Sequence, residues 1–165
     1  MKRNKVSFIT EGAIIAALYV ALTYLAFSVN LASGPIQVRF AEALSVLPFF
    51  TSAAIPGLFI GCLIANIATG CVIWDIFFGS IATLIGALVA YSIRNTSRWL
   101  VPIPNILANT LIVPFVLIYA YGEATAYYFL LISIALGEII SSGALGMVLL
   151  FALNKYKNVI FKSRS

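Results

Sequence analysis

The stretch "RFAEALSVLPFFTSAAIPGLFIGCLIANIATGCVIWD", residues 39–75, decides how this chain folds. Two opposite charges, Arg39 and Glu42, stand at its beginning, and the next charged residue is Asp75 at its end. The apolar segment between them is longer than the roughly 17–25 residues that one membrane-spanning helix needs. Pro56 and Gly57, near its middle, favour the start of a new helix. We therefore predict two short membrane helices rather than one long one.

The composition of the whole chain indicates a membrane protein. Of its 165 residues, 62% are hydrophobic and 9% are charged, whereas soluble domains average roughly 45–50% and 25%. So few polar atoms cannot cover a water-facing surface, and the solvent of this chain must be lipid. The length suits about one domain, and we expect residues 1–165 to form a single integral-membrane domain.

The uncharged intervals predict an all-α bundle of six transmembrane helices. The expected helices cover residues 8–30, 39–52, 55–70, 74–93, 102–121 and 124–153, with a loop at 31–37.

The basic residues orient these spans. With six spans, nine of the ten lie on one side, which the positive-inside rule makes the cytoplasm. These nine are Lys2, Arg3, Lys5, Arg94, Arg98, Lys155, Lys157, Lys162 and Arg164. We therefore predict a multi-pass protein of the plasma membrane with both termini in the cytoplasm. The tenth basic residue, Arg39, lies at the outer mouth of the second span.

Few polar residues lie within the apolar segments, and each needs a partner or a wet cavity there. The six with the strongest claim to a site are Arg39, Glu42, Asn66, Asp75, Asn109 and Glu138. The predicted topology places the first four near the outer face, with Asn109 and Glu138 deeper. Together they predict an outward-facing polar cavity whose floor is formed by the two deeper residues. Asn105 lies nearer the cytoplasmic end.

Each of these residues also has a simpler interpretation. Arg39 and Glu42, three residues apart, can pair with each other on one helix face. Asp75 can cap a helix after an interfacial Trp74. Asn109 can serve only to hydrogen-bond Glu138, and Tyr128 can belong to an interfacial aromatic belt.

Motifs of common enzyme classes are missing from the sequence. There is no GxxxxGK[ST], HExxH or GxSxG pattern, and histidine is absent. Cys62 and Cys71 are best interpreted as small apolar residues. We expect no enzyme activity, no cofactor or metal, and no nucleic-acid partner.

Small residues recur at every fourth position on several predicted helices, which lets helices pack closely in a membrane. We interpret the sets near Gly61, Gly86 and Gly137 as internal packing. The first helix differs, because Gly12 and Ala16 stand beside a second series, Ala13, Ala17 and Ala21. That series is available for docking on a separate membrane partner.

Six short spans, a basic cytoplasmic side and "AIIAALYVA" (13–21) together resemble the substrate-binding (S) components of energy-coupling factor (ECF) transporters. The segments "QVRFAEALSVLPFF" (37–50), "GLFIGCLIAN" (57–66) and "WDIFFGSIATLIGALVAY" (74–91) are similar to the QueT branch, which is assigned to uptake of queuosine precursors. The resemblance covers nearly the whole chain.

The resemblance implies a module that binds its substrate from outside and works with a transmembrane coupling protein and two ATPase subunits. It also implies that the face formed by Ala13, Ala17 and Ala21 docks on the coupling protein. The substrate would be a 7-deazaguanine, such as the aminomethyl or cyano derivative, or queuine.

Such a ligand suits the polar residues, because one carboxylate can accept both donors of the guanine edge. Either Glu138 or Glu42 would read that edge, and either Arg39 or Asn109 would donate to the carbonyl oxygen. An aromatic face would be supplied by Trp74 or Tyr128. Asp75 would pair with an aminomethyl cation.

Three other classes compete with this interpretation. The chain can be an S component for another vitamin, such as riboflavin, thiamine or biotin. It can be a stand-alone secondary transporter that uses its acids as proton or cation sites, or a purely structural membrane subunit.

Overall fold

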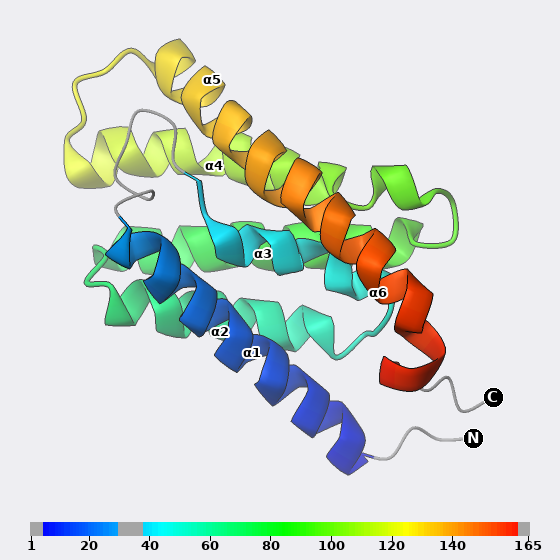
Figure 1. The fold of residues 1–165 in the computed structure, drawn as a ribbon. Coiled ribbons are helices and arrows are strands. Elements are labelled where there is room, and N and C mark those ends of the chain that lie inside the picture. The colour runs from blue at the N-terminus through cyan, green and yellow to red at the C-terminus, as the bar shows by residue number, and fades with distance from the viewer. Residues whose placement is uncertain (1–4, 30–37, 162–165) are drawn as a thin grey trace.

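The computed structural model describes residues 5–29 and 38–161, and within these ranges the chain is entirely helical, with no strand. The elements in chain order are α1 (Lys5–Ser28), η1 (Phe40–Phe49), α2 (Ala54–Ala68), α3 (Ile73–Ile93), η2 (Arg98–Leu100), α4 (Ile103–Tyr121), α5 (Tyr127–Glu138), η3 (Ile139–Leu145) and α6 (Gly146–Ile160). Successive long elements run in opposite directions along one bundle (Figure 1).

Four helical stretches of the described chain are long and apolar enough to cross a membrane. They are Lys5–Ser28, Ile73–Ile93, Arg98–Tyr121 and Tyr127–Lys157. The all-α prediction is confirmed, and most helix ends lie within a few residues of the expected positions. The last helix continues to Ile160 instead of ending at residue 153. The predicted loop at 31–37 lies outside the described residues, as do four of the nine basic residues used for orientation.

The predicted helix at 39–52 is not an ordinary α-helix. Its ten residues, Phe40–Phe49, form a 3₁₀-helix that contains Pro48. A 3₁₀-helix rises about 2.0 Å per residue against about 1.5 Å in an α-helix. The segment therefore extends about 20 Å where an α-helix of the same length would extend about 15 Å. This stretching lets a short segment reach further across the bundle.

The final helical rod changes its winding in the middle. α5, η3 and α6 follow one another without a break and appear as one rod from yellow to red (Figure 1). η3 is π-helical, a winding often found at functional sites. It contains Ser141 and Ser142, which are both fully buried. Two hydrogen bonds join this segment to the chain around η1, from Arg39 N–H to Ser141 Oγ (3.0 Å) and between the hydroxyls of Ser45 and Ser142 (2.6 Å).

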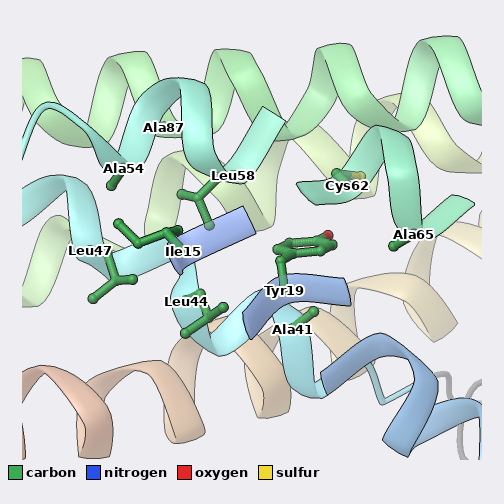
Figure 2. Close-up of a cluster of buried hydrophobic side chains, with 10 residues drawn as sticks. All are labelled: Ile15, Tyr19, Ala41, Leu44, Leu47, Ala54, Leu58, Cys62, Ala65 and Ala87. Atoms are coloured by element: carbon green, nitrogen blue, oxygen red, sulfur yellow. The ribbon is translucent and has the colours of Figure 1, made fainter. Parts of the chain in front are cut away.

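Glycines set the close contact of α1 with α2. A Cβ added at Gly57 would lie 2.7 Å from the carbonyl oxygen of Gly12, and one at Gly61 would lie 2.7 Å from Cβ of Tyr19. The neighbouring apolar core joins α1, η1, α2 and α3, and Tyr19 projects into it beside Leu44 and Leu58 (Figure 2). The prediction of internal packing by these small residues of α2 is therefore confirmed.

The Gly57→Ala substitution should lower the free energy of unfolding in detergent by about 1–3 kcal/mol, the usual cost of overpacking. The new methyl group meets a backbone oxygen that cannot move without separating the two helices. Gly143→Ala is the matched control, because a Cβ there meets only Ile106 Cδ1 at 3.7 Å and Ile139 Cγ2 at 3.9 Å. Thermal unfolding of both variants measures the difference, and equal stabilities would contradict the packing described here.

Candidate functional site

A cavity of about 410 Å³ opens where α1 and α2 end, α3 begins and α4 ends. Its size is within the roughly 300–1,000 Å³ that is typical of small-molecule sites. Three of the residues predicted from the sequence line it, namely Arg39, Asn66 and Asp75. The other lining residues are Tyr19, Thr23, Ala26, Phe27, Thr69, Gly70, Cys71, Leu117, Tyr121 and Glu123.

Asp75 is held at the cavity wall from two sides. It lies in the first turn of α3, where the helix dipole favours a carboxylate. The N-cap of α3 is Val72, so the expectation that Asp75 caps the helix is wrong. The Tyr121 hydroxyl donates to Asp75 Oδ2 at 3.0 Å and accepts a hydrogen bond from Val72 N–H at 3.3 Å. The end of α4 is thereby tied to the beginning of α3.

Gly79 leaves room for two polar groups of the cavity. A Cβ added at this residue would lie 3.3 Å from Asn66 Nδ2 and 3.4 Å from Asp75 Oδ1. The absence of a side chain at Gly79 therefore lets a donor from α2 and an acceptor from α3 approach the same place. Together they offer complementary hydrogen-bonding groups to one small molecule.

Arg39 presents its charge to the same cavity. Its backbone is extended (φ −106°, ψ 103°), and its half-buried side chain lies at the cavity lining. Asp75 attracts the guanidinium most strongly, followed by Glu42. Within the described part of the chain, however, Arg39 forms no ion pair within 4.0 Å, so the expected simple pair with Glu42 is not formed. A guanidinium held near acids without direct pairing retains donors for a ligand.

A second polar cluster lies away from the cavity lining. Glu42 accepts hydrogen bonds from the Tyr19 hydroxyl (2.5 Å, to Oε1) and from Asn105 Nδ2 (2.9 Å, to Oε2). Asn105 Nδ2 also lies 3.4 Å from Glu138 Oε2 and 3.5 Å from Ser142 Oγ. Glu42, Asn105 and Glu138 are at most 6% exposed. Tyr19 belongs to this cluster and to the cavity wall, and therefore links the two.

The structure separates the residues that the sequence analysis grouped into one pocket. Glu42 and Glu138 lie in the buried cluster rather than in the lining of the cavity. Asn109 donates to the carbonyl oxygen of Asn105 (3.2 Å), so the expected hydrogen bond to Glu138 is not formed within the described chain. Trp74 and Tyr128, the expected stacking residues, are 58% and 77% exposed on the outside of the bundle. Trp74 lines a separate apolar groove between α3 and α4.

Three central residues were missing from the predicted site: Tyr19, Asn105 and Tyr121. Asn105 had one usable signal, because it stands four residues before Asn109 and so lies on the same face of a helix. Tyr19 and Tyr121 occur in apolar sequence among many aromatic residues, and nothing in the pattern distinguishes them.

Acidic side chains outnumber basic ones in the two clusters. Glu42, Asp75 and Glu138 are buried, and Arg39 is the half-buried base beside them. Uncompensated charge is costly in a low-dielectric interior. A ligand that brings hydrogen-bond donors or a positive charge therefore suits this end of the bundle better than an anion.

Comparison with known proteins gives consistent matches. The family model described as QueT transporter matches residues 9–155. The queuosine precursor transporter QueT of Lactococcus lactis subsp. cremoris (strain MG1363) is 38% identical over 86 residues. This match covers 52% of the chain and 50% of the relative, so it spans about half the length of that protein. No solved structure matches the chain. Both matches are to transporters rather than to enzymes.

The two cysteines should report the accessibility of the cavity. Cys71 lines the cavity and is half-buried, whereas Cys62 is 2% exposed in the core. A small maleimide should therefore modify the native protein once, as measured by intact-protein mass spectrometry. Cys71→Ala should abolish the modification and Cys62→Ala should leave it unchanged. Modification of Cys62 in the folded protein would contradict the cavity as described.

Proposed function

Because this chain belongs to the QueT transporter family, we propose that it binds a queuosine precursor of the 7-deazaguanine type and delivers it into the cell. It acts as the substrate-specificity (S) subunit of an ECF importer. One observation carries this proposal: a cavity of about 410 Å³ in the helical bundle whose lining includes Arg39, Asn66 and Asp75.

The polar groups of the cavity complement a 7-deazaguanine. The Asp75 carboxylate accepts from the ring N–H and exocyclic amine side by side, or pairs with an aminomethyl cation. Arg39 and Asn66 supply donors for the ring carbonyl oxygen. Tyr19 and Tyr121 supply aromatic surface for the flat ring. The residue assignment therefore moves from Trp74 and Tyr128, which point outward, to two tyrosines in the cavity wall.

In the topology that we propose, the protein crosses the plasma membrane six times as one domain, with both termini in the cytoplasm. The passes are α1, η1, α2, α3, α4 and the rod α5–η3–α6. The beginning of α1, the α3–α4 connection and the end of α6 lie at one end of the bundle (Figure 1), and these parts carry Lys5, Arg94, Arg98, Lys155 and Lys157. The positive-inside rule makes this end cytoplasmic, so the cavity at the opposite end faces outward.

The surface of α1 supports docking on a coupling protein. Gly12 and Ala16 are buried against α2, whereas Ala13, Ala17 and Ala21 are exposed on the same helix. Small exposed side chains allow another membrane helix to approach closely. We place the transmembrane coupling protein on this face, with two ATPase subunits supplying the energy from the cytoplasm.

Binding to Asp75→Asn tests the ligand assignment. The substitution keeps the shape of the side chain but removes its charge, so affinity for the aminomethyl derivative should fall about 10- to 100-fold, as for loss of one charged hydrogen bond. Affinity for the uncharged cyano derivative should fall much less if Asp75 pairs with the aminomethyl cation, and by a similar factor if Asp75 reads the guanine edge. Calorimetric titration of both ligands into purified protein measures the contrast. Unchanged affinity for both would refute a role of Asp75 in binding.

Docking can be tested without disturbing the cavity. Ala17→Trp places a large side chain on the exposed face of α1 and should greatly reduce co-purification with the coupling protein and the ATPases. Affinity for the deazaguanine should remain unchanged. The matched control is Ile132→Trp, which alters an exposed position of α5. If both variants retained the complex equally, the proposed docking face would be wrong.

A further inference from the structure

Both oxygens of the Glu42 carboxylate accept hydrogen bonds from within the protein. One of its oxygens accepts from Tyr19 of α1 and the other from Asn105 of α4. Glu42 itself is 1% exposed, in η1. A carboxylate held on both oxygens by two different helices has little capacity left for a ligand. Its position between Tyr19 and Asn105 indicates that Glu42 holds other side chains in place.

The orientation of the Asn105 side chain is determined by this acid. Its Nδ2 faces Glu42 and Glu138, whereas its Oδ1 is buried without a hydrogen-bond partner in the described structure. Rotating the amide by half a turn would put Oδ1, an acceptor, in place of the Nδ2 donor that binds Glu42 Oε2 at 2.9 Å, and that hydrogen bond would be lost. Glu42 therefore decides the orientation, and the amide oxygen remains unpaired in the described structure.

Gly86 of α3 makes room for this amide. A Cβ added at Gly86 would lie 2.8 Å from Asn105 Oδ1 and 2.8 Å from Asn105 Cα. No side chain fits there unless α3 and α4 separate or Asn105 moves. The absence of a side chain at Gly86 thus leaves room for the unpaired oxygen and lets the other end of the amide face Glu42.

We propose that Asn105 is a positioning residue for the ligand cavity. Through Glu42 it fixes the Tyr19 side chain in the cavity wall, and Gly86 is the residue on α3 that admits it. The proposal rests on the proposed function, because the group finally positioned is part of the ligand-binding wall. It extends the site to α4 and α3 residues that do not line the cavity.

A double-mutant cycle distinguishes positioning from general stabilisation. Tyr19→Phe removes the hydroxyl that binds Glu42 but keeps the aromatic ring, and Asn105→Ala removes the donor on the other side without a clash. Each single variant should weaken binding of the aminomethyl derivative about tenfold. Because both residues act through Glu42, the affinity of the double variant should be close to that of the weaker-binding single variant. If the two residues acted independently, their effects would multiply and the affinity would fall about 100-fold.

A pair of glycine variants provides a second route to the same result. Gly86→Ala should displace Asn105 and reproduce the loss of affinity seen with Asn105→Ala. Gly143→Ala, whose added Cβ makes only ordinary contacts, should keep wild-type affinity. Melting temperatures without ligand establish that each variant is folded before its affinity is compared. If Gly86→Ala does not fold, Asn105→Ala takes its place in the comparison with Gly143→Ala.

The outcomes separate the two proposals. If the wild-type protein binds the ligand and the cycle is additive, or Gly86→Ala binds as Gly143→Ala does, the positioning role is overturned and the proposed function stands. If the wild-type protein binds no deazaguanine, both are overturned. Coupled losses in the cycle together with a selective loss in Gly86→Ala support the positioning role.

Discussion

The partners of a polar group inside this bundle come from the chain or from a ligand, because lipid supplies none. Glu42 shows the consequence most clearly. Its carboxylate binds Tyr19 from α1 and Asn105 from α4, and the same amide reaches Glu138 at the end of α5. One buried acid and the amide that it binds thus connect four elements, α1, η1, α4 and α5. The cavity is built against this connection.

The separation between the buried cluster and the cavity explains how one small bundle can be both stable and receptive. Glu42 and Asn105 bind each other and leave little for a ligand. The Arg39 side chain takes no part in that hydrogen bond. It lies near acids but without a direct ion pair in the described chain. Among the described residues, the Tyr121 hydroxyl is the one side-chain donor to Asp75, whose carboxylate has further acceptor capacity at the cavity wall. The groups proposed to bind the ligand therefore lie at the open end, and the hydrogen-bonded cluster lies behind them.

Hydropathy and charge were sufficient to predict the helical class, the break near Pro56 and most helix ends, because bilayer thickness fixes segment length. They were not sufficient to predict the rotation of each helix about its axis. In lipid, inward and outward faces are both apolar, so the sequence could not decide whether Trp74 and Tyr128 stack on a ligand or belong to an interfacial aromatic belt. Their exposed side chains favour the belt. The 3₁₀ winding of η1 and the hydrogen bond between Asn105 and Glu42 could not be predicted either. Both depend on tertiary contacts between segments far apart in the sequence.

The most direct measurement is calorimetric titration of the purified wild-type protein with a panel of small molecules. The panel contains the aminomethyl and cyano 7-deazaguanines, queuine, riboflavin, thiamine and biotin. A deazaguanine should bind with the highest affinity and at one site per chain, and the other vitamins should give no measurable heat. Preferential binding of riboflavin, thiamine or biotin, or no binding by any deazaguanine, would contradict the assignment of this cavity.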